Sequence, residues 1–248
     1  MIKFFRKIRY NLMEQNKTGK YFKYAIGEIV LVVIGILIAL SINNWNENRK
    51  SNLKETQILN EIANSINSDL ELYENIFDYR LDIKKQGIDS LLLLIGENNP
   101  IEDGVFIRLL YRSSTEISVT YDSGPYDALK SSGFDIIRND SLRAKIINTY
   151  ESGLPAYKGF IDKYDFEKEP ITAKYLQNIT ESYVCNDEDQ PWHFHKKPKF
   201  DNILRNQEFL ELLNIESQKY DHYQRRLNSL RRLLNEVKSK ILIELEKS

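Results

Sequence analysis

The sequence predicts an all-α protein, with one N-terminal transmembrane helix followed by two long antiparallel helices and a cap of shorter helices in an exported helical domain. Three observations lead to this prediction: an apolar run near the N-terminus, a stretch from Asn44 to Ile95 without proline, and apolar residues at helical spacing near the C-terminus. The expected parts are a basic tail (1–23), a transmembrane helix (24–44) and an exported domain (45–248), the last comprising a long helix (about 45–95), a cap (about 101–200) and a long C-terminal helix (about 206–246).

The apolar run extends from Tyr24 to Ile42 and carries a single charge, Glu28. At about 1.5 Å per residue, a helix of this length reaches roughly 28 Å, close to the hydrocarbon thickness of a bilayer. Aromatic residues flank it on both sides, with Trp45 just past its end, as at membrane–water interfaces. We therefore expect a membrane helix whose immediate partner is the lipid bilayer.

The charges around this run predict its orientation. Residues 1–23 contain seven Lys and Arg against one acid, so the tail carries +6, and residues 24–248 must sum to −7 because the whole chain carries −1. Basic residues beside a first span are retained in the cytoplasm. The tail is therefore expected inside and the domain from Trp45 onward outside the cytoplasm.

Cleavage of the apolar run as a signal peptide is the alternative. The residues Ala39-Leu40-Ser41 form a passable small-x-small cleavage site. The basic region of more than twenty residues and the length of the apolar run favour an uncleaved signal anchor.

The basic tail has two interpretations. Four apolar residues at helical spacing would give a short amphipathic helix in the inner leaflet interface, and an unstructured positive tail is the alternative. A tail of 23 residues is too short for a kinase, cyclase or DNA-binding domain. The basic residues expected to contact the membrane surface are Lys3, Arg6, Lys7 and Arg9.

One stripe of the membrane helix combines an acid with small residues. Glu28, Gly35 and Ala39 recur at helical spacing, and Gly35 and Ala39 form a small-xxx-small pair that allows close approach of two helices. An acid inside the membrane favours a partner or the head groups. We expect a helix–helix contact here, in a homodimer or with another membrane protein; the alternative is that Glu28 reaches toward Lys20 and Lys23.

The two long helices follow from apolar periodicity. The first keeps helical spacing, with a shift of phase before Leu81, and ends at the turn 96–100. The C-terminal stretch has an a/d seam, which predicts either a helix buried against its own domain, the preferred interpretation, or an intermolecular coiled coil. The seam residues are Leu213, Tyr220, Tyr223, Leu227, Leu230, Leu234, Val237 and Ile241.

The middle of the chain predicts shorter elements. We expect a helix over 101–112, an extended segment over 115–121, and a helix opened by Gly124-Pro125 and closed by Gly133. Asn139 or Asp140 is expected to cap a helix that ends near Gly153. Two further helices, 155–169 and 170–184, and a polar loop over 185–199 complete the prediction.

The sequence offers few signs of chemistry. It contains no phosphate-binding loop, nucleophile elbow, zinc-protease or haem motif, so we expect neither a catalytic residue nor a cofactor. The candidate metal ligands are Cys185, His193 and His195, but their spacing matches no metal motif and an ordinary surface loop is preferred. Basic residues beyond the span are outnumbered by acids, which argues against nucleic acid binding.

Two parts of the sequence resemble a known family. The opening MIKFFRKIR, YAIGEIVLVVIGILIAL and INNWNE, and the later block at 126–143 that begins YDALKSSG, are similar to a family of uncharacterised bacterial membrane proteins, domain of unknown function 6090. The resemblance is strong over 1–48 and fair over 121–150. It implies a single-pass protein of the bacterial inner membrane and carries over no catalytic residue.

These observations predict a function class rather than a reaction. We expect a membrane-anchored cell-envelope protein that acts as a non-enzymatic interaction or scaffolding module. The alternatives are an extracytoplasmic sensor or small-ligand-binding domain that signals through a partner's transmembrane helix, and an enzyme whose site is invisible in the sequence.

Overall fold

The computed structural model describes residues 10, 18–97, 100–186 and 192–247, and these are mostly helical. The chain forms two compact units, Met1–Glu55 and Thr56–Ser248. The basic residues expected at the membrane surface, from Lys3 to Arg9, lie outside the described residues.

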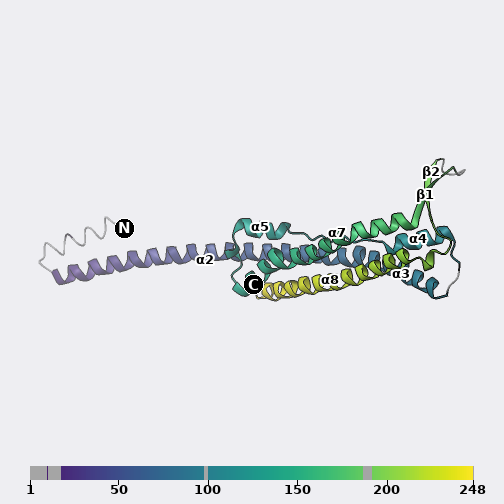
Figure 1. Cartoon of the computed structure of the whole chain (residues 1–248). Coiled ribbons are helices and arrows are strands. Elements are labelled where there is room, and N and C mark those ends of the chain that lie inside the picture. The colour runs from purple at the N-terminus through teal and green to yellow at the C-terminus, as the bar shows by residue number, and fades with distance from the viewer. Residues whose placement is uncertain (1–9, 11–17, 98–99, 187–191, 248) are drawn as a thin grey trace. The chain divides into compact units, whose positions relative to one another are not determined.

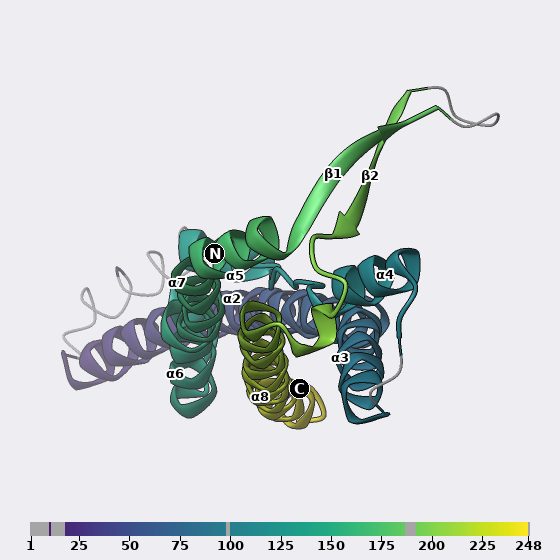
Figure 2. The same cartoon turned by 45° about the vertical axis from the view of Figure 1, so that its right-hand side comes forward.

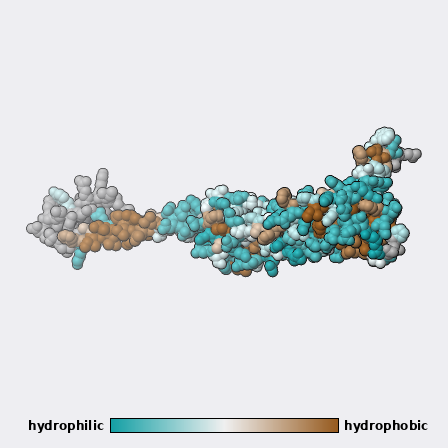
Figure 3. Space-filling view, in the orientation of Figure 1, coloured by the Kyte–Doolittle hydropathy of each residue, from teal (hydrophilic) through white to brown (hydrophobic). Residues whose placement is uncertain are grey.

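The first unit contains the start of helix α2 (Thr18–Leu72). Its most apolar stretch has a mean hydropathy of 2.8, and none of that stretch is buried. Figure 3 shows it as a band of apolar side chains on the surface. An apolar helix of this length that finds no cover within its own chain has the length and composition needed to cross a membrane.

The second unit begins with the rest of α2, the π-helical turn η1 (Tyr73–Asp78) and helix α3 (Tyr79–Glu97). The π turn explains the shift of phase predicted before Leu81, because a wider turn moves the following side chains around the helix axis. Tyr73, Phe77 and Leu81 are consequently all buried.

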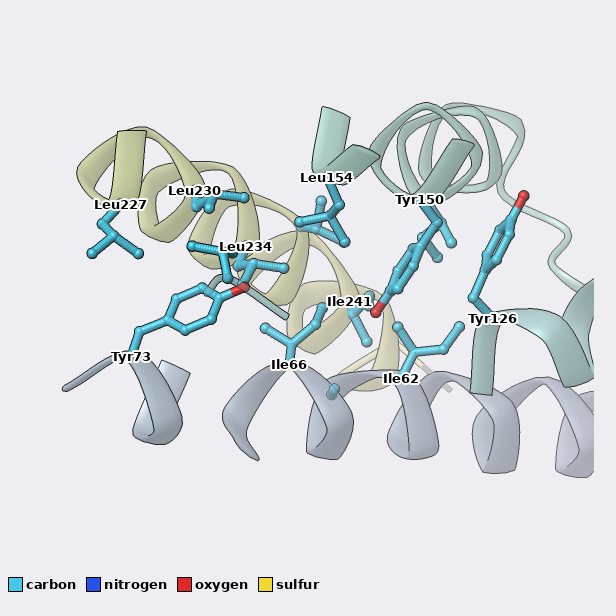
Figure 4. Close-up of a cluster of buried hydrophobic side chains, with 14 of the residues drawn as sticks. Ile62, Ile66, Tyr73, Tyr126, Tyr150, Leu154, Leu227, Leu230, Leu234 and Ile241 are labelled. Carbon is cyan, nitrogen blue, oxygen red and sulfur yellow. The ribbon is translucent and has the colours of Figure 1, made fainter. Parts of the chain in front are cut away.

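Helix α8 (Gln207–Leu245) begins where predicted, with the side chain of Asn206 accepting a hydrogen bond from the Phe209 N–H. The seam residues from Tyr223 to Ile241 are buried in one cluster with side chains of α2 and α7 (Figure 4). Leu213 is buried in a second cluster with side chains of α3 and α4, and Tyr220 is half exposed. The ion pairs Lys84–Glu216 and Asp78–Arg231 connect α8 to the first long helical stretch. The earlier residue of the first stretch, Asp78, pairs with the later residue of α8, Arg231, and the later residue Lys84 pairs with the earlier residue Glu216.

The shorter elements between residues 103 and 148 match most expectations. Asn139 caps α6, its side chain accepting from the N–H groups of Ser141 and Leu142. Residues 115–121 are neither helix nor strand, and Gly133, at φ 96°, ends α5. The bounds are α4 (Asp103–Ser113), α5 (Gly124–Ser132), η2 (Phe134–Ile136) and α6 (Asp140–Asn148).

The predicted break at Gly153 and the predicted boundary at Pro170 are wrong. A π turn, η3 (Thr149–Gly153), joins α6 directly to α7 (Leu154–Ile179), which runs through Pro170 and lies beside α8 (Figure 1). Proline removes one backbone hydrogen bond from a helix. Pro170 is exposed, so water can reach this turn, while burial of residues on either side, such as Ile161 and Ile179, holds the helix together.

The domain is mostly helical, as predicted, but a β-hairpin replaces the expected end of a helix and the polar loop. Strands β1 (Thr180–Cys185) and β2 (His193–Pro198) pair antiparallel, from Thr180 opposite Pro198 to Cys185 opposite His193. Figure 2 shows the hairpin extending away from the helices. The β-branched and aromatic residues of TESYVC favour a strand over the helix predicted for them. A short 3-10 turn, η4 (Ile203–Arg205), leads into α8.

Candidate functional site

A groove with a volume of about 670 Å³ lies between helix α4 and strand β2. We call it the α4–hairpin groove. Volumes of this order are typical of small-ligand sites. Helices α3 and α4 form one side, and the hairpin forms the other. Its principal lining residues are Ile107, Arg108, Tyr111, Arg112, Phe194 and Lys196.

A glycine sets the position of α4. A Cβ atom at Gly87 of α3 would lie 2.4 Å from the backbone nitrogen of Ser113 and 2.8 Å from the carbonyl carbon of Arg112. No larger residue fits at this distance, so the glycine permits the two helices to approach closely. Lys84, one turn earlier, donates a 2.6 Å hydrogen bond to the Ser113 carbonyl and fixes the end of α4. The base of the groove is therefore held by tightly packed backbone.

The lining of the groove has one sign of charge. Arg108, Arg112 and Lys196 contribute three cations, and no Asp or Glu is among the described residues that line the groove. The whole chain, in contrast, contains almost equal numbers of basic and acidic residues. The Lys196 ammonium lies 5.7 Å from the centre of the Tyr111 ring, within the range of a cation–π contact. The groove therefore combines positive charge with apolar and aromatic surface.

One polar atom of this lining lacks a partner. The Arg112 Nε is buried and makes no hydrogen bond in the described part of the chain, although another nitrogen of the same guanidinium donates to the Gln86 side chain. A buried donor without an acceptor costs about 1–3 kcal/mol. The groove is thus lined by a guanidinium whose orientation is held by Gln86.

A second candidate site is a charged network inside the helical unit. Lys84 is fully buried and pairs with Glu216, which is itself 2 % exposed. Lys219 is also fully buried and donates a 2.7 Å hydrogen bond to Glu116. Burial lowers the pKa of Lys84, and Glu216 opposes this effect. For Lys219 burial acts in the same direction, but the neighbouring carboxylates outweigh it and raise the pKa.

The network continues to α7 through Asp165. Its carboxylate lies 3.7 Å from the Lys219 ammonium and accepts a hydrogen bond from the Tyr223 hydroxyl. Burial raises the pKa of Asp165, and burial together with this hydrogen bond raises the pKa of Tyr223. Perturbed groups of this kind mark functional sites, but also structural ion pairs. Because the two lysines have no exposed surface, we interpret the network as a link between α3, α7 and α8.

A third polar cluster joins α2 to the segment before α5. The Asp69 carboxylate accepts from the Asp122 N–H at 3.0 and 3.2 Å, and the Ser65 hydroxyl donates to Asp122. Burial raises the pKa of Asp69 to about 6, and the Asp122 carboxylate acts in the same direction. The cluster has one acid that titrates near neutral pH.

The block at 126–143 that resembles the known family lies at α5 and α6, where its side chains make packing contacts. The Tyr126 ring stacks on Tyr150 with centroids 4.8 Å apart, and its hydroxyl donates a 2.7 Å hydrogen bond to Glu151 (Figure 4). Lys130 pairs with the same carboxylate at 2.6 Å. These contacts hold α5 against the turn η3.

The candidate metal ligands come together in part. The Nε2 atoms of His193 and His195 lie 2.5 Å apart, and Cys185 is directly opposite His193 in the hairpin. No group of three His, Cys, Asp or Glu residues that could hold a metal ion occurs among the described residues. The acids at 187–189, which belong to the same constellation, lie outside them.

The three residues of the predicted membrane contact share one helix, α2. Gly35 and Ala39 are exposed and Glu28 is half exposed, and a Cβ atom at Gly35 would meet nothing within 4 Å. The helix–helix contact stays a prediction, since it needs a partner outside this chain.

The α4–hairpin groove was not predicted from the sequence. Arg108 and Arg112 are four residues apart on a short amphipathic helix, a pattern that is common on solvated helix faces. The groove exists because residues 194–196 form a strand beside that helix, and the sequence had predicted a loop there. Only a correct prediction of the hairpin could have pointed to it.

Comparisons with known proteins place the chain in a family without assigning an activity. The search of curated proteins and the search of solved structures each found no match. A family model matches residues 28–182, more than half of the chain, and this region includes α4, α5 and α7. The chain therefore belongs to the family described as a family of unknown function, DUF6090.

Proposed function

We propose that the protein is a single-pass, uncleaved protein of a bacterial inner membrane, with a cytoplasmic tail and an exported helical domain that acts as a non-enzymatic interaction or scaffolding module. The observation that carries the proposal is the apolar stretch of α2, none of which is buried within the chain. The basic tail supports the orientation, because positive residues are retained in the cytoplasm.

An interaction role is supported by how the domain uses its polar groups. Lys84 pairs with Glu216 and Lys219 with Glu116, and neither lysine has exposed surface with which to meet a substrate. The long helices, including an α8 of 39 residues, provide extended surface instead. The exposed stripe of Glu28, Gly35 and Ala39 is the proposed contact with a second membrane helix.

Selective cysteine labelling tests the orientation. Cys185 is the only cysteine and is partly buried, so we would use a Cys185→Ser variant with Ser51→Cys at an exposed position just past the apolar stretch. A membrane-impermeant maleimide should label this cysteine in intact bacterial cells that express the protein, after permeabilisation of any outer membrane. Labelling only after disruption of the inner membrane would contradict the proposal.

Crosslinking and affinity purification of the intact protein from membranes test the partner. We expect a homodimer or one stoichiometric membrane protein, and Gly35→Ile should reduce its recovery because a large side chain separates closely packed helices. The matched control is Gly27→Ile, which makes the same change about 100° around the helix from the stripe. Equal effects of the two variants would contradict a contact through the stripe.

The second candidate function is a ligand-binding module, and the α4–hairpin groove is the observation that favours it. The groove is partly apolar and has convergent cations from α4 and β2. It is open to solvent rather than closed, so ligand exchange would require no rearrangement of the helices.

A further inference from the structure

We propose that the α4–hairpin groove binds a small organic anion, in which an oxyanion group such as a carboxylate is joined to an apolar ring or chain. This inference concerns one site in the helical unit. It goes beyond the proposed scaffolding role, and it does not depend on the orientation of the protein in a membrane.

The charge of the ligand follows from the cations of the groove. Arg108, Arg112 and Lys196 line it, and none of the lining residues within the described ranges is an acid. Cations that converge without an acid raise the local concentration of anions. A planar guanidinium also matches the geometry of an oxyanion better than a point charge does.

Arg112 identifies the position of the oxyanion. Its Nε is a buried donor without an acceptor in the described residues, and Gln86 holds another nitrogen of the same group. The guanidinium is therefore oriented before a ligand arrives. An oxyanion in the groove would accept hydrogen bonds from guanidinium N–H groups that Gln86 does not use, and this charge-assisted pairing would favour binding.

The apolar and aromatic residues that line the groove indicate that part of the ligand is apolar. Ile83 and Ile107 contribute partly buried aliphatic surface, and Tyr111 and Phe194 are 55 % and 77 % exposed. Two large aromatic side chains that leave this much surface uncovered beside a cavity provide contact area for a ring or chain. A simple inorganic anion would leave these walls unused.

Photoaffinity labelling of the full-length protein in lipid nanodiscs tests the proposal. The probe is 4-benzoylbenzoate, an aromatic carboxylate that crosslinks on irradiation, and the uncharged counterpart is 4-benzoylbenzamide. Mass spectrometry should place the carboxylate label within residues 104–115 and 192–198. One charge-assisted hydrogen bond predicts labelling about tenfold stronger than with the amide.

Substitutions distinguish specific binding from general attraction. Arg112→Gln and Lys196→Gln should each reduce labelling by about tenfold, and Phe194→Ala should reduce it through lost ring contact. The control, Arg225→Gln, removes an exposed cation of α8 outside the groove and should leave labelling unchanged. Circular dichroism verifies that each variant is folded. Because Lys196 and Phe194 are exposed, their variants test the site even if the Arg112 variant unfolds.

Three results would overturn the proposal. These are equal labelling by the acid and the amide, crosslinks outside both the two segments and the other lining residues Ile83 and Ser182, and full labelling of the folded groove variants.

Discussion

Individual residues of this protein show how burial changes the chemistry of a charged group. Lys84 and Lys219 are both fully buried, yet their pKa values move in opposite directions. Burial disfavours the charged form of each, and the outcome depends on how many carboxylates lie close enough to oppose it. Glu216, Glu116 and Asp165 all raise the pKa of Lys219. Around Lys84, Glu216 and Glu116 do not overcome the effect of burial, to which the neighbouring Lys219 cation adds.

Asp69 predicts a pH dependence of stability. Its pKa rises from 3.8 to about 6 on folding, so between these values the folded protein binds more protons than the unfolded chain. Stability therefore falls as the pH rises through this window, by up to about 3 kcal/mol. Asp69→Asn has no carboxyl to ionise, and the variant should lose this component of the pH dependence and gain stability at pH 7.

Denaturant unfolding of the full-length protein in nanodiscs at pH 4.5 and pH 7, followed by near-ultraviolet circular dichroism, measures this difference. The matched control, Asp221→Asn, makes the same chemical change at an exposed position of α8. An unchanged pH dependence in Asp69→Asn would mean that burial of this carboxyl does not control the effect.

At the scale of elements, close packing at one glycine places α4 against α3. Gly87→Ala should destabilise the helical unit by about 1–3 kcal/mol, because the new methyl group would overlap the backbone of residues 112 and 113. The same substitution at Gly159 of α7, where nothing lies within 4 Å, should instead stabilise by roughly 0.5–1 kcal/mol. Thermal unfolding of the two variants measures both effects, and a change of the same sign would contradict the packing argument.

The elements also show what sequence patterns can and cannot predict. Apolar periodicity predicted α8 and its buried seam, and the phase shift before Leu81 corresponds to the turn η1. Pro170 and the hairpin were mispredicted, because neighbouring packing overrides a local helix breaker and because β-propensity depends on context. The groove depends on both α4 and β2, so an error in one element concealed the site.

At the scale of the whole molecule, burial of the C-terminal seam in the core of the helical unit determines whether the seam is free to pair with a second chain. Leu227, Leu230 and Leu234 have no exposed surface, and they pack against side chains from α2 and α7 of the same chain. An intermolecular coiled coil through these residues would require the core to open. The seam is therefore expected to stabilise the fold of one chain, whatever partner the membrane helix contacts.

Leu230→Ala tests this expectation. Removing a fully buried leucine side chain should destabilise the fold by about 2–5 kcal/mol through lost burial and the cavity left behind. The control, Leu242→Ala, makes the same change at a position of α8 that is 45 % exposed and should have a much smaller effect.

If the seam joins two chains, the midpoint of thermal unfolding should also rise with protein concentration by mass action. Thermal unfolding of both variants over a wide concentration range distinguishes the two uses, since a seam buried within one chain gives a large loss for Leu230→Ala and a midpoint independent of concentration. Equal losses for the two variants, or a midpoint that rises with concentration only while Leu230 is present, would show instead that α8 pairs with a second copy.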